Sequence, residues 1–595
     1  MFSLIFEMLR FANLSRTAAL RPHFLRMSSR SFVLPARHPV VDSLKAADQD
    51  KVAIRHVPSG NTYTYGDMLH DVGYWRTKLQ EITAAATPEA SGGHRIAIMG
   101  ENSYQFAVAF YASLTLPGTL AVPLCTNHTS AEIQYQLDNS QASLIITPER
   151  FANKVEQFHN ADRQVLTFEA IQPADKTAKA APAGAARVHE FREDATYEGA
   201  GYMLYTSGTS GNPKGVVTPL ETFMAQAKAL SAAWKINENT NFLHTLPLHH
   251  VHGVLIALTL PVLARARVEF LFPFSPAAVL DRLATPPSVL PPINTYTAVP
   301  TIYSRLVNYI DEHLPEEKHA AVQEGFSRLQ LAMCGSAALP DPLRQSWDRV
   351  TNGQVSLLER YGMTETGITL SQPLAPLSSR RPGTVGHPVP SVVARIVDPD
   401  SKEVLFDSSN AAAYKFNKEV SGDLVLGGPT VFKEYWHKPE ATRDTFLPDT
   451  GNGERWFVTG DVASVNPEDH SIKILGRASM DIIKSGGEKL SALEIEREIL
   501  AVPHVAETAV VGLPSREWGE QATAIVVLKS SASPEYRQNF DYQYLKTQLR
   551  EKLSGYKIPR EVLVLDTPIP RNQMGKVNKK SLVKTLFPDR IKAKI

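Results

Sequence analysis

The segment Tyr205-Thr-Ser-Gly-Thr-Ser-Gly-Asn-Pro-Lys-Gly215 lies between two short apolar stretches, residues 202–204 and 216–217. Its glycines allow the backbone to turn tightly and to point several N–H groups into one concavity. Hydroxyl side chains add further donors, and Lys214 adds a positive charge suited to phosphate. A polyphosphate requires this combination of many donors, little side-chain bulk and a cation. The segment therefore predicts a phosphate-binding loop between two buried strands.

This loop differs from the Walker A loop, which has the pattern Gly-x-x-x-x-Gly-Lys-Ser/Thr at the start of a helix. Here Pro213 precedes the lysine and Gly215 follows it. A flexible Gly/Ser linker would explain the composition, but it would explain neither the lysine nor the flanking apolar stretches. The residues expected to contact the phosphates are Thr206, Ser207, Gly208, Thr209, Ser210, Gly211 and Lys214.

Six further motifs follow the loop. In chain order they are LPLHHVHG at 246–253, CGSAAL at 334–339, RYGMTE at 360–365, WFVTGD at 456–461, GR at 476–477 and PRNQMGK at 570–576. Together with the loop they resemble the adenylate-forming (ANL) superfamily of acyl-CoA synthetases, luciferases and peptide-synthetase adenylation domains. The resemblance implies an α/β protein with a large N-terminal domain of layered sheets and helices and a small mobile α+β C-terminal domain. It also implies an ATP-dependent acid–CoA ligase that forms AMP through an acyl-adenylate.

The resemblance assigns the nucleotide contacts to these motifs. Gly335 and Ser336 would flank adenine, and Tyr361 would stack on it with a flat apolar face. Asp461 would accept from both ribose hydroxyls, because a carboxylate has two oxygens. The other nucleotide-binding residues implied are Arg360, Gly362, Met363, Thr364, Arg477 and Lys576.

Three residues are expected to act on the reacting groups. Thr364 would donate to the α-phosphate, and Glu365 would ligate Mg²⁺ on the ATP phosphates as a hard oxygen ligand. Lys576 would bridge the acid and the α-phosphate, which stabilises negative charge as the carboxylate attacks phosphorus in line. No side-chain nucleophile is needed, because the acid is itself the nucleophile. Taken alone, each residue could instead be a member of a surface ion pair.

The predicted hinge between the two domains lies at residues 477–481. This run is one residue longer than the usual family spacing, so the resemblance does not fix the pivot within it. In the family the C-terminal domain rotates here after adenylation, which would withdraw Lys576. The rotation would bring small residues toward the CoA thiol, where they suit a pantetheine tunnel or an ordinary tight turn. These residues are Ser485, Gly486 and Gly487.

Two arginines occupy positions where a fatty-acid pocket would be apolar, Arg305 and Arg360. An arginine can bind a second carboxylate bidentately, and burying an arginine without such a partner is costly. The alternative for Arg305 is that it caps a helix or pairs with Asp311.

The segments 249–253, 357–365 and 571–576 resemble the malonyl-CoA synthetase branch of the superfamily, and the longer hinge and residues 481–487 resemble its mitochondrial members in particular. This resemblance makes Arg305 the first candidate, and Arg360 the second, for binding the distal carboxylate of malonate. Two apolar residues would lie on the side that accepts the methyl group of methylmalonate. The rest of the expected acid pocket is His250, Val251 and Ile368, of which Val251 and Ile368 are the apolar pair.

The composition is that of an ordinary globular chain. Of 595 residues, 43% are hydrophobic and 21% charged, and 62 Lys+Arg against 61 Asp+Glu give a net charge of +1. This balance does not favour a nucleic-acid partner. Cys125 and Cys334 are too few for a disulfide framework and form no CxxC motif. No apolar run reaches the ~20 residues that cross a bilayer.

Residues 8–41 contain six arginines, no lysine and no acidic residue, with serines interspersed. This composition is typical of a mitochondrial transit peptide, which we predict for residues 1–38, and it predicts a matrix location. A disordered basic tail on a cytoplasmic protein is the alternative. The C-terminal sequence KAKI is not the peroxisomal signal SKL.

Short apolar strands alternate with helices in the N-terminal part, as at 95–99, 106–116 and 142–147. This alternation predicts a mostly parallel sheet covered by helices on both faces. Residues 173–187 are rich in Ala, Pro and Lys and predict a surface connection. Folded structure is expected to begin near Pro39.

The C-terminal part predicts a compact α+β unit. Helices are expected at 492–500 and 541–553, and strands at 507–512, 522–528 and 561–565. The predicted domains are a transit peptide at 1–38, an AMP-binding domain at 39–476, the hinge at 477–481 and a C-terminal domain with the catalytic lysine at 482–595.

Three other functions are compatible with parts of this pattern. A medium-chain or aromatic acyl-CoA synthetase would differ only in its acid. An adenylation domain that loads a carrier protein would share the motifs, although no carrier domain follows Lys576. A catalytically silent nucleotide-binding scaffold would not need Lys214, Glu365, Asp461 and Lys576 together. The expected partners are small molecules (a carboxylic acid, ATP and CoA), with no nucleic acid and no transmembrane segment, in a monomer or homodimer.

Overall fold

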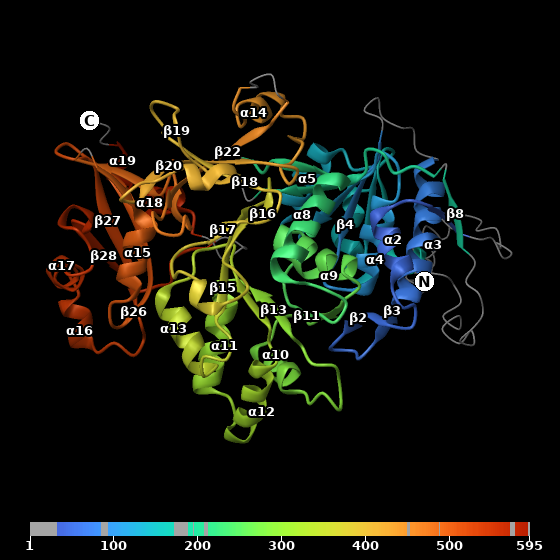
Figure 1. The fold of residues 1–595 in the computed structure, drawn as a ribbon, viewed down its shortest axis with the longest axis horizontal. Coiled ribbons are helices and arrows are strands. Elements are labelled where there is room, and N and C mark those ends of the chain that lie inside the picture. Colours follow the sequence, from blue (N-terminus) through green and yellow to red (C-terminus); the bar gives the residue numbers. More distant parts are fainter. Residues whose placement is uncertain are drawn as a thin grey trace, which may run out of the picture.

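The computed structural model describes residues 32–84, 93–171, 189–193, 195–206, 212–448, 453–486, 488–571 and 577–592. Two large sheets with helices between them form the body of the molecule, an antiparallel sheet lies along one side, and the C-terminal unit lies at one end (Figure 1). None of the helices within these ranges is both long and apolar enough to span a bilayer.

The first large sheet has the order β21-β10-β9-β5-β4-β6-β7. Strands β9 to β7 are parallel, whereas β10 and β21 are antiparallel to their neighbours. The predicted strand at 95–99 is confirmed as β4, and the one predicted at 142–147 begins two residues later, as β6. The bounds are β4 Arg95–Met99, β5 Leu120–Leu124, β6 Leu144–Thr147, β7 Gln164–Thr167, β9 Gly201–Tyr205, β10 Gly215–Pro219 and β21 Glu434–Tyr435.

The second large sheet has the order β17-β16-β15-β14-β13-β11-β12-β2-β3, parallel from β15 to β2 and antiparallel at both edges. The mostly parallel architecture predicted from the alternation of strands and helices is therefore confirmed. The bounds are β2 Val52–His56, β3 Thr62–Thr64, β11 Asn241–His244, β12 Arg267–Phe270, β13 Thr295–Ala298, β14 Leu331–Cys334, β15 Leu357–Met363, β16 Gly367–Ser371 and β17 His387–Pro388.

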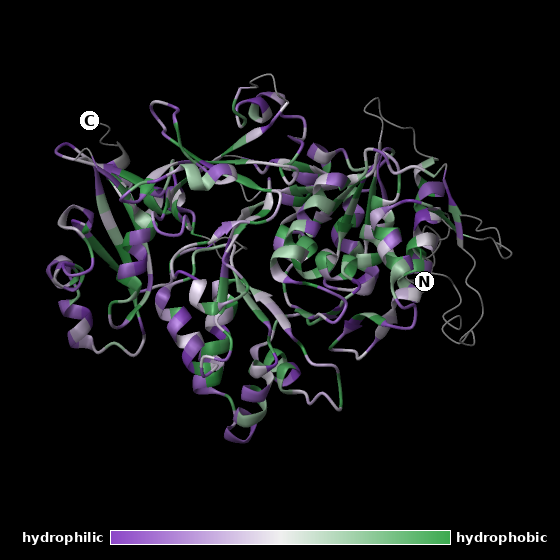
Figure 2. Ribbon diagram, viewed as in Figure 1, coloured by the Kyte–Doolittle hydropathy of each residue, from purple (hydrophilic) through white to green (hydrophobic). Residues whose placement is uncertain are grey.

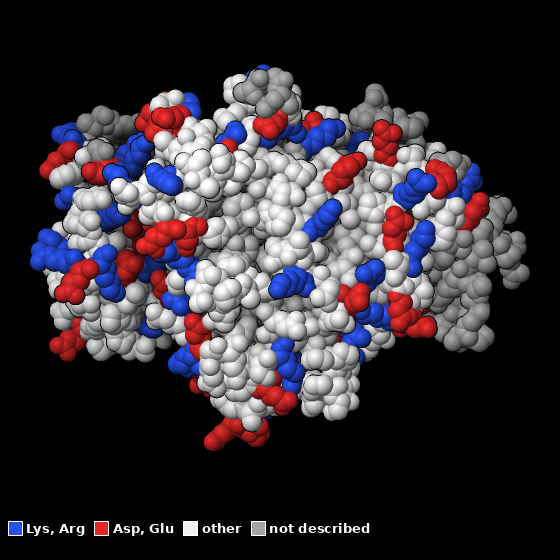
Figure 3. Space-filling model, viewed as in Figure 1, with Lys and Arg blue, Asp and Glu red and all other residues white. Residues whose placement is uncertain are grey.

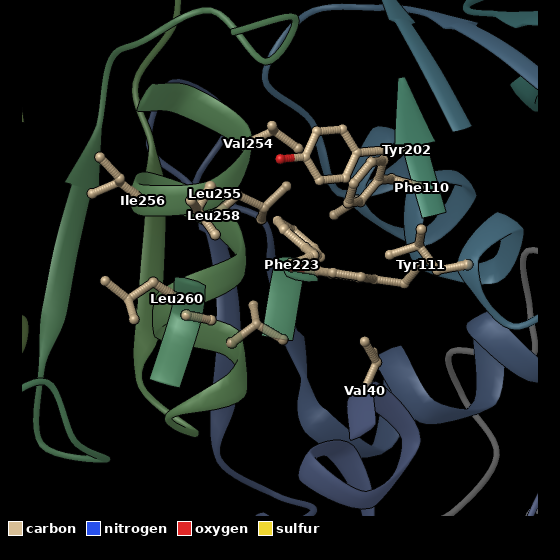
Figure 4. Packing of buried hydrophobic residues seen from close by; sticks show 14 of the residues in the cluster. Val40, Phe110, Tyr111, Tyr202, Phe223, Val254, Leu255, Ile256, Leu258 and Leu260 are labelled. Carbon is tan, nitrogen blue, oxygen red and sulfur yellow. The ribbon is translucent and has the colours of Figure 1, made fainter. Parts of the chain in front are cut away.

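Helices from distant parts of the chain fill the space between the two sheets. One cluster of buried apolar side chains draws on strands of both sheets and on these helices, and Figure 4 shows Phe110, Tyr202 and Phe223 meeting within it. Burial of this apolar surface is the main stabilising contribution to such a layered fold. The helices are α2 Pro39–Ala46, α3 Tyr65–Ala84, α4 Tyr104–Leu114, α8 Leu220–Trp234 and α9 Leu260–Leu263.

The outer faces of both sheets are covered too. Four helices pack on the second sheet, and α11 shows why: Tyr303, Leu306, Val307 and Ile310 recur at helical spacing and all are buried. Helix α5 covers the first sheet through Ile133 and Leu137, and apolar segments lie inside the layers in Figure 2. The covering helices are α5 Ser130–Ser140, α10 Pro276–Ala284, α11 Pro300–Glu312, α12 Glu316–Ser327 and α13 Asp341–Val350.

An antiparallel sheet with the order β19-β18-β20-β22-β23 leads into the C-terminal unit, whose sheet has the order β25-β24-β27-β26 with β28 on β27. Helix α15 and strand β28 match the predicted ranges, whereas β26 and β27 are longer because they pair over their whole length. The strands are β18 Val393–Val397, β19 Val404–Asp407, β20 Val420–Gly427, β22 Trp456–Val465, β23 Ile472–Arg477, β24 Ile482–Ser485, β25 Glu488–Ser491, β26 Val505–Ser515, β27 Gly519–Leu528 and β28 Glu561–Leu565. The helices are α14 Pro439–Arg443, α15 Ala492–Leu500, α16 Pro534–Asn539, α17 Tyr542–Leu549, α18 Lys579–Leu586 and α19 Pro588–Lys592.

Packed structure begins earlier than Pro39. Strand β1 (Phe32–Pro35) pairs in parallel with β8 (His189–Arg192), and Leu34 is fully buried. His38 is buried as well: its Nδ1 accepts from the backbone of Val40, and its Nε2 lies 3.1 Å from the carbonyl oxygen of Leu114. The end of the range predicted for the transit peptide therefore belongs to the fold. The predicted surface connection at 173–187 lies outside the described residues.

Acidic and basic side chains are interspersed over the face shown in Figure 3. No field of one sign covers this face, in keeping with the near-zero net charge.

Trp347 gives a test of the α11–α13 layer. It is fully buried, its ring packs edge-on against Tyr303, and its Nε1 donates to the carbonyl of Val355 at 2.8 Å. Trp347→Ala should lower the free energy of unfolding by about 3–5 kcal/mol, measured by urea denaturation, because it leaves a large cavity. Leu377→Ala, at a side chain 49% exposed, is the control and should stay within about 0.5 kcal/mol. Equal losses of unfolding free energy in the two variants would contradict the packing of α13 against α11.

Candidate active site

The predicted phosphate loop is the connection of a β-hairpin. Strands β9 and β10 pair antiparallel, with Tyr205 opposite Gly215. Thr206 and Lys214 close the loop: the amide of Thr206 donates to the carbonyl of Lys214 at 3.0 Å, and the amide of Lys214 donates to Oγ1 of Thr206 at 3.1 Å. The two predicted strands are therefore confirmed, while residues 207–211 at the tip lie outside the described residues.

Glu365 lies beside this hairpin in the turn between β15 and β16. Its carboxylate is buried and accepts a hydrogen bond of 2.7 Å from the hydroxyl of Tyr435 on β21. The ammonium of Lys214 lies 3.8 Å from the centre of the Tyr435 ring, a cation–π contact. Burial lowers the pKa of Lys214, and the nearby Glu365 opposes that shift. One tyrosine thus orients both the predicted phosphate-binding cation and the predicted metal ligand.

Asp461 is the second buried carboxylate of the site. The hydroxyl of Tyr361 donates to it at 2.5 Å, and Nε of Arg477 lies 2.9 Å from its other oxygen. Asp461 and Arg477 face each other across the β22–β23 ladder. Burial raises the pKa of Tyr361 and the Asp461 charge adds to this, so the phenol remains a donor. Three predicted nucleotide residues are therefore in contact.

The β14–β15 segment supplies the predicted adenine-flanking residues. Gly335 follows β14, and Ser336 has a φ of +69°; its hydroxyl lies 3.2 Å from Nδ1 of His252. The other ring nitrogen of His252 lies 2.5 Å from Oγ1 of Thr297 on β13. Burial lowers the pKa of His252 well below its usual value, so the ring is neutral at physiological pH. Gly362 and Met363 continue β15, and Thr364 follows in the turn.

Arg360 is a buried cation adjoining this segment. It is 5% exposed, and its Nε and Nη2 have no hydrogen-bond partner among the residues that the structure describes. A Cβ atom at position 335 would lie 2.4 Å from the guanidinium carbon, so only glycine allows this approach. Burial lowers the pKa of Arg360 to about 10, so the guanidinium is still charged at neutral pH.

The other predicted acid-pocket residues lie on three segments: residues 250–251, β16 and α11. Val251 and Ile368 belong to the same apolar cluster, whereas His250 is half-buried with its ring 4.1 Å from that of His249. Arg305 is exposed on α11, where its guanidinium lies 4.7 Å from the ring centre of Phe274. Asp311, its alternative partner, is instead paired with Arg349 at 2.7 Å.

The hinge region is linked to the C-terminal unit through Asp481. One oxygen of Asp481 accepts from the amide of Arg477 at 3.1 Å, and the other lies 2.6 Å from Nζ of Lys579. Lys579 also pairs with Glu496 at 2.7 Å. Lys576 itself lies outside the described residues, but the bridge between Arg571 and Val577 closes its loop.

The predicted CoA segment is the turn between β24 and β25. Ser485 is buried and pairs with Glu488, and Gly486 has a φ of +60° with its amide donating to Trp518 at 2.8 Å. The tight-turn interpretation therefore holds for Ser485 and Gly486. Gly487 lies outside the described residues.

Buried carboxylates and a hairpin cation lie where these sheets meet, as expected for a nucleotide-dependent, adenylate-forming enzyme. Residues 43–436 match the family described as AMP-binding enzyme, and residues 494–576 match the AMP-binding enzyme C-terminal domain. The chain belongs to the AMP-binding enzyme family and is an AMP-forming acid–CoA ligase that uses ATP and CoA. The predicted family and enzyme class are confirmed.

Three similar proteins illustrate this membership. A CoA ligase of Gibberella moniliformis is 38% identical over 577 residues, covering 90% of this chain and 92% of that protein. The mitochondrial malonate–CoA ligase ACSF3 of Mus musculus is 37% identical over 507 residues, covering 83% and 82%. The crystal structure of ATP-bound MatB from Rhodopseudomonas palustris superposes with a TM-score of 0.74 at 28% identity, covering 93% of this chain and 99% of that one.

Tyr435, Thr297 and Lys579 are site neighbours that the sequence interpretation missed. Tyr435 stands outside the six motifs and 70 residues from its partner Glu365. Lys579 lies three residues after Lys576, and this proximity was the only sequence feature that could have pointed to its role.

Asp461→Asn tests the nucleotide site. Losing a charge-assisted acceptor should raise the KM for ATP by about 10- to 150-fold, since hydrogen bonds to charged groups contribute about 1.5–3 kcal/mol. The KM for the acid should change less, and Asp444→Asn at an exposed position is the matched control. An unchanged KM for ATP, measured by pyrophosphate release, would remove Asp461 from the site.

Proposed function

We propose that this ligase converts malonate, ATP and CoA to malonyl-CoA, AMP and pyrophosphate. The observation that carries the proposal is the buried guanidinium of Arg360, two of whose nitrogens have no partner within the described part of the chain. A guanidinium buried without a partner strongly destabilises the folded protein unless an anion pairs with it. The second carboxylate of a short dicarboxylate would supply that partner bidentately. The name of the murine relative, a malonate–CoA ligase, supports the same acid.

In the proposed first half-reaction, one carboxylate oxygen of malonate attacks the α-phosphorus of ATP, and the bond to pyrophosphate breaks. Lys214 and the hairpin amides hold the leaving phosphates, Asp461 holds the ribose, and Lys576 and Thr364 stabilise charge at the α-phosphate. In the second half-reaction the CoA thiolate attacks the acyl carbonyl and AMP leaves. Ser485, Gly486 and Gly487 would line the path of the thiol.

Glu365 is the proposed ligand of Mg²⁺. Magnesium ions at nucleotide sites are usually held by one or two carboxylates together with substrate phosphates and water. Glu365 fits this pattern, because Tyr435 occupies only one of its carboxylate oxygens in the described structure. The ion would supply charge neutralisation on the phosphates.

Arg360 takes precedence over Arg305 as the proposed partner of the distal carboxylate. Arg360 is buried with two nitrogens that have no acceptor among the described residues, whereas Arg305 is exposed and stacked on Phe274. A charged group gains more from an ion pair where water is excluded. Val251 and Ile368 would then face the C2 position, which leaves methylmalonate as a second substrate.

We also propose a mitochondrial location. The leader composition predicts it, and the murine relative is named as mitochondrial. A leader removed before Phe32 would leave the β1–β8 pairing and buried His38 intact.

A panel of acids tests the proposed substrate. CoA-dependent pyrophosphate release should be fastest, as kcat/KM, with malonate, and slower with acetate or octanoate, because neither supplies the second carboxylate. Protein starting at Phe32 should be used so that the leader does not interfere. Octanoate or acetate exceeding malonate would replace this proposal with a monocarboxylate ligase.

Arg360→Met tests the carboxylate partner. The ratio of kcat/KM for malonate to that for acetate should fall by about 10- to 150-fold, the loss of one charged hydrogen-bonded contact. Arg305→Met is the matched comparison and should change this ratio less. If Arg305→Met lowers the ratio more than Arg360→Met does, the distal carboxylate would be assigned to Arg305, and malonate would remain the substrate.

A further inference from the structure

A second cluster of charged side chains lies outside the nucleotide and acid sites, where α10 covers the second large sheet. Strand β12 contributes Arg267 and Glu269, which point to the same face because they are two residues apart. Glu269 faces Arg55 on β2, and Arg267 faces Asn241 on β11. Arg282 reaches the same place from α10. Three arginines thus surround a single carboxylate.

Glu269 is already occupied by one of the three. Arg282 donates to both of its oxygens, through Nε at 2.6 Å and Nη2 at 2.6 Å. Nδ2 of Asn241 donates to the same carboxylate at 2.9 Å. Nε of Arg55 remains 4.0 Å away, which is an ion-pair distance and not a hydrogen bond. The carboxylate is fully buried, and these three hydrogen bonds use most of its acceptor sites.

Each arginine keeps a buried nitrogen without a partner. These are Nε of Arg55, Nε of Arg267 and Nη1 of Arg282, and none of them has a hydrogen-bond acceptor among the described residues. Arg282 is 4% exposed. Burial lowers the pKa of Arg267, Glu269 opposes this shift, and Arg282 and Arg55 add to it. The cluster therefore lacks both negative charge and hydrogen-bond acceptors.

We propose that this cluster binds a phosphate-class oxyanion. Such an anion brings several acceptor oxygens and up to two negative charges. The cluster has three guanidinium groups and one carboxylate, so these charges and acceptors match what it lacks. The Arg55 side chain is 21% exposed, so the cluster is open to solvent on the β2 side. None of its residues belongs to the proposed nucleotide or acid site, so the anion would be bound in addition to the substrates.

The carbonyl groups of the neighbouring 286–292 segment help to hold the cluster. Nη2 of Arg282 donates to the carbonyl of Pro291 at 2.6 Å, and Asn241 donates to that of Pro292 at 3.1 Å. These bonds fix Arg282 and Asn241 and leave Arg267 without an equivalent contact in the described structure. Arg267 is therefore the residue whose removal tests the site with the least disturbance.

The test is the thermal midpoint of the full chain during titration with inorganic phosphate, at constant ionic strength set with chloride. A ligand that binds only the folded state raises stability by RT ln(1 + [L]/Kd). The midpoint should rise and saturate for the wild type and for Lys214→Gln, whose nucleotide loop is weakened. The rise should be lost in Arg267→Gln. Pyrophosphate in a parallel series distinguishes a monophosphate site from a diphosphate site.

Arg265→Gln is the matched control, because Arg265 lies two residues away and pairs with Glu238 at the surface. It should respond to phosphate as the wild type does. If Arg267→Gln does not fold, Arg55→Gln takes its place with the same expected loss. A wild type that shows no saturable rise, or a rise of equal size in Arg267→Gln, would overturn the proposal.

Discussion

The geometry of the proposed nucleotide site depends on the hydrogen bonds made by the buried carboxylate of Asp461. It accepts from Tyr361 on the second large sheet and from Arg477 on the antiparallel sheet. Glu365 makes the equivalent link to the first large sheet through Tyr435. Two carboxylates therefore join three sheets, and both are predicted to contact ATP or its metal ion. Because burying a carboxylate without donors is costly, these donors both permit the burial and fix the orientation.

The proposed acid site is also built around a buried charged side chain, which here is positive. Arg360 is buried beside neutral His252, and Gly335 gives its guanidinium the room to lie there. The carboxylates of the nucleotide site have their donors within the described protein, whereas Arg360 lacks acceptors for two nitrogens. Buried polar groups that already have partners before the substrate binds serve to orient the substrate. A buried charged group that has no partner selects a substrate that carries the opposite charge.

Much of this site could be predicted because the motifs are local. The hairpin around Thr206 and Lys214, and the facing positions of Asp461 and Arg477, follow from short segments with recognisable residue types. Strand β4 and helix α15 were predicted at their observed bounds, since apolar periodicity and capping are local signals. Strands β26 and β27 exceed their predicted ranges because their pairing continues beyond the apolar pattern of each segment.

What could not be predicted depends on long-range packing. The role of Tyr435 requires β21 to lie beside β10, a pairing between segments more than 200 residues apart along the sequence. The contrast between buried Arg360 and exposed Arg305 is likewise a property of the assembled layers, and it is the reason that Arg360 is proposed ahead of Arg305. The pairing of Phe32–Pro35 also depends on β8, which no local pattern near the N-terminus indicates.

In the proposed reaction, malonate itself attacks the α-phosphorus of ATP. Malonate labelled with ¹⁸O in its carboxylates, incubated with the enzyme, ATP and CoA, tests this directly by mass spectrometry of the nucleotide product. The account predicts AMP that carries one ¹⁸O from malonate for each malonyl-CoA formed, because the acyl–oxygen bond is the one that breaks in the second half-reaction. Malonyl-CoA formed together with unlabelled AMP, or with ADP and labelled phosphate, would contradict it.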